Sequence, residues 1–169
     1  MGYVHDTSVS QFIPASLIQK SAGTWTPTLS SNTIGDVRTA ADASFSLYIP
    51  ILVPSNGAAM KGAYLKSIDV FYAIATAAAD DFATVELEKM TLPASGTAVS
   101  GASVPIALDA AHDTAAERKG SGHHKMTVSL ITPAWVDDGE CYWLVLSVDA
   151  ATTTVFTLWG AVANYTLRL

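Results

Sequence analysis

Apolar and polar residues alternate in steps of two along most of this chain. In "FATVELEKMTL" (82–92), Val85 and Leu87 alternate with two glutamates, which is typical of a β-strand with one buried and one solvated face. In "CYWLVLSVDA" (141–150) both alternating faces are apolar, as expected of a central strand covered on each side. The alternation predicts strands over residues 24–30, 44–53, 64–76, 82–92, 125–132, 141–150, 153–160 and 161–169.

Short turns separate these segments, and the pattern predicts no long amphipathic helix between them. Asn56 and Gly57 form one such turn signal. Residues 1–22 are less regular and are interpreted as an N-terminal arm. We therefore predict an all-β protein with a single domain over residues 23–169. Its fold class is an antiparallel β-sandwich, in the form of a jelly roll of eight or nine strands.

Charge limits the partners that this sandwich can have. Charged residues make up 14% of the chain and the net charge is −6, whereas about 25% charged residues is usual. The acidic balance disfavours nucleic acid and anionic lipid, which need clustered Lys and Arg. No apolar run reaches the ~20 residues of a membrane helix, and the N-terminus lacks the pattern of a secretory signal. We expect cytoplasmic synthesis, no nucleic-acid or membrane partner, and outer faces covered by copies of the same chain, as a trimer or larger array.

The most polar passage is "DAAHDTAAERKGSGHHKM", residues 109–126. His112, His123 and His124 bring nitrogen ligands that suit a divalent metal. However, the adjacent His123 and His124 point to opposite sides of an extended segment, and no H-x-x-x-H spacing is present. We therefore predict no metal site in this passage, and a solvent-facing insertion between two strands instead.

Helix capping explains the middle of the same passage. Thr114 and Glu117 match the capping box, in which a hydroxyl and a carboxylate satisfy the first free amides of a helix. Gly120 is a natural end for that helix. We predict a short helical turn, and we predict that three residues of the insertion contact a neighbouring subunit: Arg118, Lys119 and His124.

The sequence does not indicate catalysis. The pairs Asp80-Asp81 and Asp137-Asp138 lie in expected turns, where aspartate bonds its own backbone, and adjacent carboxylates do not face each other across a substrate. Cys141 lies in a predicted strand and is expected to be inert. The prediction is a protein that is not an enzyme, with no catalytic residue, cofactor or metal. Calcium at an aspartate turn is kept as an alternative.

The four tryptophans are the remaining candidates for a binding role. Trp143 and Trp159 lie within strongly apolar strands and are predicted to be core residues. Trp25 and Trp135 lie near strand ends. Exposed there, they would stack on sugars or anchor a subunit contact, a role for which tryptophan is enriched. The core or an interface is the favoured place for both.

The segment "TAAERKGSGHHKMTVSLITPAWVDDGECYWLVLSVDA", followed by the terminal "GAVANYTLRL", resembles small β-sandwich proteins of tailed phages and viral metagenomes. The likeness runs from about Ala43 to Leu169. It implies a virion structural protein: a decoration or cement subunit of the capsid, or part of a fibre or tail, with a viral shell or tail protein as partner. The resemblance assigns no functional residue.

These observations lead to two functional hypotheses. The leading one is a non-enzymatic structural protein of a virus particle, made in the host cytoplasm and located on the virion. It would self-associate through charge-poor sheet faces, loops and the N-terminal arm. The alternative is a carbohydrate- or receptor-binding β-sandwich module that uses exposed tryptophan and loop carboxylates.

Overall fold

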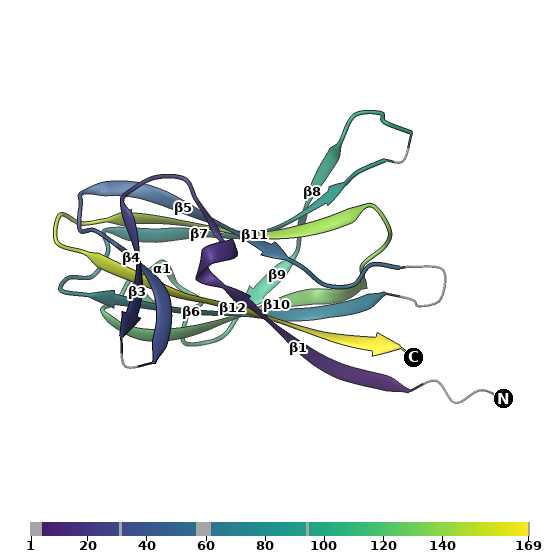
Figure 1. Cartoon of the computed structure of the whole chain (residues 1–169), viewed down its shortest axis with the longest axis horizontal. Helices are drawn as coiled ribbons and strands as arrows, with labels where there is room; N and C mark the ends of the chain where they lie inside the picture. The colour runs from purple at the N-terminus through teal and green to yellow at the C-terminus, as the bar shows by residue number, and fades with distance from the viewer. Residues whose placement is uncertain (1–4, 31, 57–61, 94, 169) are drawn as a thin grey trace.

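The computed structural model describes residues 5–30, 32–56, 62–93 and 95–168 of the chain. Its main strands run along the long axis of the molecule and lie in two layers (Figure 1). The helical elements of this described part are a 3₁₀ turn, η1 (Ala15–Leu17), and a short helix, α1 (Ala115–Arg118). The strands are β1 (Asp6–Pro14), β2 (Gln19–Lys20), β3 (Trp25–Ser30), β4 (Thr33–Arg38), β5 (Ala43–Ile51), β6 (Ala63–Ala75), β7 (Asp81–Thr91), β8 (Ser100–Val104), β9 (Ile106–Leu108), β10 (Gly122–Trp135), β11 (Glu140–Ala150) and β12 (Val155–Arg168).

Across the described residues, these strands form a seven-stranded and a five-stranded sheet. The larger sheet has the order β3-β4-β12-β6-β10-β9, with β1 also paired to β12, and the smaller sheet has the order β2-β5-β11-β7-β8. The longer strands β1, β5, β6, β7, β10, β11 and β12, together with β8, cross between the sheets in the order of a jelly roll. The predicted antiparallel β-sandwich is therefore confirmed, with β11 in the middle of the smaller sheet as its two apolar faces predicted.

The core lies between the two sheets. Residues that point inward from β6, such as Ile68 and Val70, meet residues that point inward from the smaller sheet, such as Leu47 and Leu144, and all of these are fully buried. Every second residue of a strand points to the same side, so this packing follows directly from the alternation in the sequence. In the described ranges, no helix is both long and apolar enough to cross a membrane.

The N-terminal segment is not the separate arm that was predicted for residues 1–22. β1 pairs with β12 from Asp6 to Pro14, and β2 pairs with β5. Ile13 and Ile18 are 1% and 2% exposed and belong to the core. The segment is rich in Ser, Thr and Gln, so its apolar alternation is weak, but its backbone covers the edge of β12 in its own chain.

Two local predictions have different outcomes. The capping box is confirmed, because Thr114 Oγ1 accepts a hydrogen bond from the amide of Glu117 and the Glu117 carboxylate accepts one from the amide of Thr114. The two strands predicted over 153–160 and 161–169 are instead the single strand β12. Gly160 introduces a bulge in β12 and does not end the strand.

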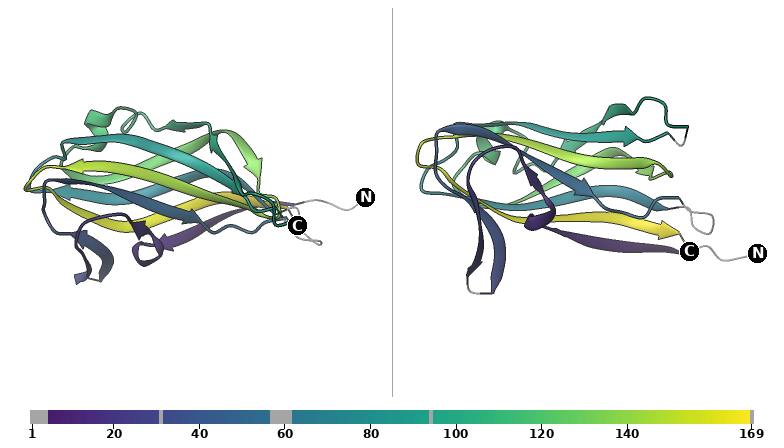
Figure 2. Two further views of the ribbon diagram at one scale, coloured as in Figure 1. Left: turned by 90° about the horizontal axis from the view of Figure 1, so that it is seen from above. Right: turned by 45° about the horizontal axis from the view of Figure 1, so that its top comes forward.

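A hairpin made of β3 and β4 stands out from one side of the sandwich (Figures 1 and 2). Only the last part of β4, Asp36 to Arg38, pairs with β12, and the rest of the hairpin leaves the sheet. Its outer part carries Leu29 and Ile34, whose exposed fractions are 75% and 72%. The hairpin therefore presents large apolar side chains to solvent next to the seven-stranded sheet.

Candidate functional site

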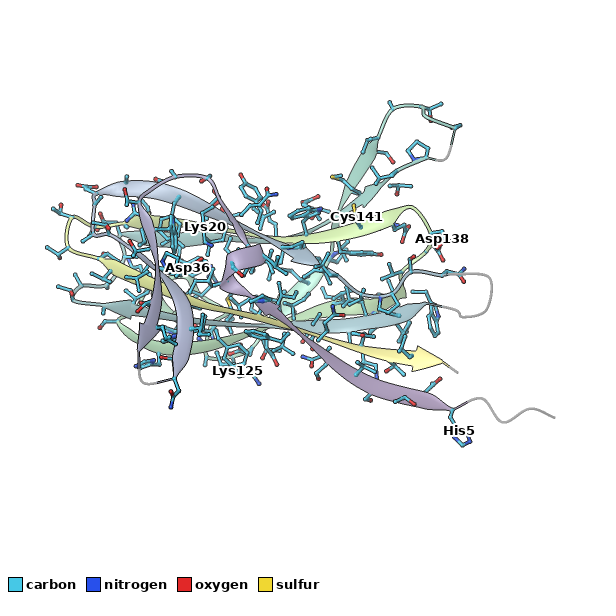
Figure 3. The ribbon with its side chains drawn as sticks, in the orientation of Figure 1. His5, Lys20, Asp36, Lys125, Asp138 and Cys141 are labelled. Carbon is cyan, nitrogen blue, oxygen red and sulfur yellow. The ribbon has the colours of Figure 1, made fainter. Side chains whose placement is uncertain are left out.

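The outer side of the seven-stranded sheet, made by β12, β6 and β10 and bordered by β1, is called the outer face below. Directly opposed residues of antiparallel strands share a face, and the register places Asp69 of β6 between Val162 of β12 and Thr127 of β10. Phe12 of β1 lies opposite Val162. Lys125 of β10 points away from the smaller sheet on this side (Figure 3). The outer face has aromatic side chains at both ends and polar side chains in its centre.

Trp159 lies on the outer face at a β-bulge in β12. The pairing of β12 with β6 skips Trp159, between Leu158 and Gly160. Gly160 has φ +139°, and a Cβ at this position would lie 2.4 Å from the carbonyl oxygen of Ile13, so the bulge requires glycine. Bulges commonly re-aim a side chain beside a functional site. Trp159 was predicted to be a core residue, but Leu158 points into the core and Trp159 points to the outer face, and the bulge lets Ala161 point into the core again.

The ring of Trp159 stacks on the ring of His123. Their centroids are 5.3 Å apart and the ring planes are inclined by 11°. Ala73 of β6 lies directly opposite His123, and its small side chain leaves room for the two rings to meet. Further along β6, the Lys125 ammonium lies 5.9 Å from the ring centre of Phe71. These side chains give one end of the outer face an aromatic surface.

A groove of about 390 Å³ opens beside Trp159, between β1 and the β3–β4 hairpin. This Trp159 groove is lined mainly by apolar side chains, including Phe12, Pro14, Pro27 and Ile34. Phe12 is 60% exposed and Ile34 is 72% exposed, so apolar side chains stand in solvent on both walls. The volume falls within the range of about 300–1,000 Å³ that is usual for ligand pockets.

Two contacts position the hairpin as a wall of the groove. The Lys20 ammonium forms an ion pair with the Asp36 carboxylate, where β4 leaves the sheet (Figure 3). Gly35 lies directly against β12, because a Cβ there would be 2.7 Å from the carbonyl oxygen of Leu158 and 2.9 Å from Cδ1 of Trp159. The missing side chain of Gly35 therefore allows the hairpin to approach Trp159 this closely.

Asp69 organises the polar centre of the outer face. Its carboxylate accepts hydrogen bonds from Thr127 Oγ1 at 2.6 Å and from Asn164 Nδ2 at 3.2 Å. It also lies 3.3 Å from Nζ of Lys125, and the Asp69 and Lys125 side chains are 14% and 57% exposed. The network fixes these side chains, while the exposed ammonium and the lone pairs of the hydroxyl groups can serve a polar ligand.

The other end of the outer face contains a second hollow, of about 280 Å³, lined by Asp6, Tyr64, Lys66, Trp135 and Thr166. In this Trp135 pocket, the rings of Tyr64 and Trp135 have centroids 4.9 Å apart. The register between β6 and β12 skips Lys66, so Lys66 stands outside the ladder. Thr166 is 5% exposed, and its buried hydroxyl has no hydrogen-bond partner in the described part of the chain.

In the loop before β10, the structure pairs His112 with His124. His112 Nδ1 lies 2.8 Å from the Asp109 carboxylate, and its Nε2 lies 3.2 Å from Nδ1 of His124. His124 Nε2 lies 2.9 Å from the carbonyl oxygen of Gly120, which can only accept, so this nitrogen donates. Burial lowers the pKa of His124, with the charges of His112 and His123 acting in the same direction, and these causes outweigh the hydrogen bond to Gly120.

The rings of the two histidines contact neighbouring groups of the same chain. Among the described residues, there is no group of three or more His, Cys, Asp and Glu side chains that could hold a metal ion. Arg118 is 5% exposed, and its guanidinium donates to backbone carbonyls of β7 and of the loop itself. His124 stacks on Tyr72, with ring centroids 4.6 Å apart. Arg118 is buried and His124 packs inside the chain, and the subunit contact expected of these two residues stays a prediction.

The other predicted contact residues lie elsewhere. Lys119 is half-buried and donates to the carbonyl oxygen of Asp80 at 2.7 Å. Trp25 is half-buried and packs edge-on against the core residue Phe45, with ring centroids 5.3 Å apart. Trp135 belongs to the pocket described above. Contacts of Lys119, Trp25 and Trp135 with another subunit stay predictions.

Trp143 also differs from the prediction of a core residue. It points outward from the smaller sheet, into an open hollow of about 300 Å³ whose lining includes the apolar Met90 and Val145 and the polar Gln19 and Glu88. A signal for the different role of Trp159 was present in the sequence, because a glycine directly after it, inside an alternating segment, indicates a bulge.

Comparisons with known proteins assign this chain to no family. No family model matches it, and no curated protein matches it significantly. Solved structures with a similar arrangement include a family 61 carbohydrate-binding module in complex with β-1,4-galactotriose. The identity is 11%, the match covers 92% of this chain and 91% of that one, and the TM-score is 0.45. Another is a family 11 carbohydrate-binding module from Clostridium thermocellum in complex with a β-1,3-1,4-mixed-linked tetrasaccharide, with 9% identity, coverage of 96% and 89%, and a TM-score of 0.38.

A third similar structure is the enzymatically active domain of tailspike protein 4 of bacteriophage CBA120. It shares 6% identity over 95% of this chain and 19% of that one, with a TM-score of 0.36. At such TM-scores, these likenesses carry no argument about the role of this chain. Its candidate site therefore depends on its own residues.

Proposed function

We propose that this protein is a carbohydrate-binding β-sandwich module that holds a neutral glycan on its outer face. The observation that carries the proposal is that Trp159 points outward beside a groove and next to a fixed polar centre. Sugar rings have apolar C–H faces that pack on aromatic rings, and their hydroxyl groups both donate and accept hydrogen bonds. A surface for such a ligand needs both kinds of group within reach of one another.

The polar centre supports a glycan ligand more than a purely apolar protein contact. Asp69, Asn164 and Thr127 already hold one another in place, so that a ligand would order few side chains on binding. Less conformational entropy is then lost, which favours affinity. Lys125 is 57% exposed and adds N–H donors that suit the oxygen atoms of a sugar.

The charge of the protein favours a neutral ligand. The chain carries a net charge of −6, and this charge would repel polyanionic glycans before they reach the surface. We therefore propose binding of neutral glycans without a catalytic step. A structural role on a virus particle and self-association into an array stay hypotheses beside this proposal.

Binding to neutral polysaccharides tests this function. We expect affinity electrophoresis and calorimetry to detect binding within a panel of neutral glycans that includes β-1,4-galactan and mixed-linked β-1,3-1,4-glucan. Trp159→Ala is expected to weaken that binding by about tenfold or more, since central aromatic anchors typically contribute at least this much.

Trp143→Ala is the matched control, because this tryptophan points outward from the other sheet. It should bind as the wild type does. The proposal is contradicted if no glycan of the panel binds, or if Trp143→Ala loses binding while Trp159→Ala retains it.

A further inference from the structure

We infer that the Trp135 pocket is a second subsite of the same binding face, so that the ligand is an extended chain bound along its length. This inference rests on the proposed function. The Trp159 groove and the Trp135 pocket lie at opposite ends of the outer face, and the same strands, β12, β6 and β10, run between them. A chain that lies parallel to these strands would cross the Asp69 centre on its way from one end to the other.

The length of β6 sets the size of the ligand. Ala73 lies beside the Trp159–His123 stack, and Tyr64 lies in the Trp135 pocket, on the same face of the same strand. Nine residues separate them in the sequence, which corresponds to about 30 Å of extended strand. A disaccharide cannot reach both ends of such a face, whereas an extended hexasaccharide can.

The Trp135 pocket has the groups that a sugar subsite needs. The paired rings of Tyr64 and Trp135 offer an apolar surface, and the exposed Lys66 offers N–H donors at its rim. The buried hydroxyl of Thr166 has no partner in the described part of the chain, although buried polar groups nearly always have one. The pocket therefore combines an aromatic surface with polar side chains in its lining.

An irregularity of the ladder also precedes Trp135. The register between β10 and β6 shifts between Ser129 and Ala134, immediately before Trp135. Irregularities of this kind re-aim side chains and are preserved for that purpose. Both ends of the outer face therefore present a tryptophan next to a break in the ladder, with a regular polar ladder between them.

Two linked subsites predict that affinity rises with ligand length. When one part of a chain is bound, the second part binds at a high effective concentration, and the combined affinity exceeds that of either subsite alone by about 10²–10⁴ in favourable cases. We expect a hexasaccharide of the recognised glycan to bind at least about tenfold more tightly than its disaccharide, at the low end of such gains.

The test compares disaccharide and hexasaccharide binding by calorimetry in the wild type, Trp135→Ala and Lys66→Ala. Trp135→Ala is expected to remove the gain of the hexasaccharide and to leave disaccharide binding unchanged. Lys66→Ala, which changes an exposed side chain and so preserves the fold, is expected to reduce the gain several-fold. Circular dichroism confirms that each variant is folded.

The possible results separate this inference from the proposed function. The second subsite is overturned if the wild type binds the disaccharide and the hexasaccharide with equal affinity. It is also overturned if both variants keep the higher affinity for the hexasaccharide. Neither result contradicts glycan binding itself. Failure of the wild type to bind any glycan of the panel at either length overturns the proposed function and this inference together.

Discussion

At the scale of single residues, the burial of His124 makes stability depend on pH. The His124 ring stacks on Tyr72, and its Nδ1 lies 3.2 Å from Nε2 of His112. Burial lowers the pKa of His124 below its ordinary value of 6.5. When the pH falls below 6.5, the unfolded chain therefore binds more protons at His124 than the folded chain does. The free energy of unfolding decreases as a result.

Asp109 acts in a different pH range. Burial acts to raise its pKa, but hydrogen bonds from the Thr127 amide, the His112 ring and the Ala111 amide outweigh burial and lower it below 3.8. A carboxylate with a lowered pKa stabilises the folded state above its ordinary value, and this contribution is lost as pH falls through the lowered value. The two effects therefore separate, with His124 acting from pH 6.5 downward and Asp109 only below pH 3.8.

His124→Gln tests the first of these effects. The amide does not titrate, so the variant is expected to lose less stability than the wild type when pH is lowered through 6.5. Denaturant unfolding at several pH values on both sides of 6.5 measures the difference. An equal loss of stability in the two proteins would show that His124 is not the group responsible.

At the scale of elements, the β3–β4 hairpin determines the shape of the Trp159 groove. Gly35→Ala would place a Cβ 2.7 Å from the carbonyl oxygen of Leu158 and 2.9 Å from Trp159, and these contacts push the hairpin away from β12. We expect this variant to bind glycan about tenfold more weakly, since misplacing a wall of the groove removes contacts to the ligand. Titration calorimetry with the glycan that binds the wild type measures this loss.

Gly101→Ala is the control for this hairpin variant. Its Cβ would meet only the carbonyl oxygen of Lys89, at an ordinary distance of 3.8 Å, on the outlying strand β8. Binding by this variant should equal that of the wild type. If Gly35→Ala also binds as the wild type does, the hairpin is not part of the site.

The elements that the sequence predicted correctly are those with strong apolar alternation. The expected segments 44–53, 64–76, 82–92 and 141–150 correspond to β5, β6, β7 and β11 within a few residues. β1 was missed because polar residues interrupt its apolar alternation, although its backbone pairs with β12 from Asp6 to Pro14. Two strands were predicted in place of β12 because glycine often marks a turn. The ladder between β12 and β6 instead continues on both sides of Gly160.

The site was harder to predict than the fold, for a related reason. Alternation indicates which residues share a face only while the ladder stays regular. A bulge at Trp159 changes the direction of the side chains that follow, so that Ala161 points into the core again. The distant partners of the site, such as Phe12 and Ile34 on the walls of one groove, depend on sheet order, which local sequence patterns do not determine.

At the scale of the whole molecule, the N-terminal segment is expected to be essential for folding. Its strand pairs with β12 over the full range Asp6–Pro14, and Ile13 is 1% exposed. Removing residues 1–14 exposes the β12 edge and opens the core, so we expect loss of cooperative thermal unfolding or aggregation. A truncated protein with the unfolding midpoint of the full chain would instead support the N-terminal arm outside the sandwich that the sequence suggested.

Self-association also belongs to this scale and stays a prediction. The chain is poor in charge, and Leu29 and Ile34 are 75% and 72% exposed on the projecting hairpin. Light scattering of the full-length protein tests it directly. A strict monomer at high concentration would contradict the expected trimer or larger array, without affecting glycan binding to the outer face.

The most direct test of the central claim follows the indole N–H signals of the four tryptophans by nuclear magnetic resonance while a hexasaccharide of the recognised neutral glycan is added. We predict that the signals of Trp159 and Trp135 shift together and saturate at one ligand concentration, while the signal of Trp143 on the opposite sheet stays in place. Shifts confined to Trp143, or no shift at Trp159 when the ligand is bound, would contradict the claim that the outer face of the seven-stranded sheet is the binding site.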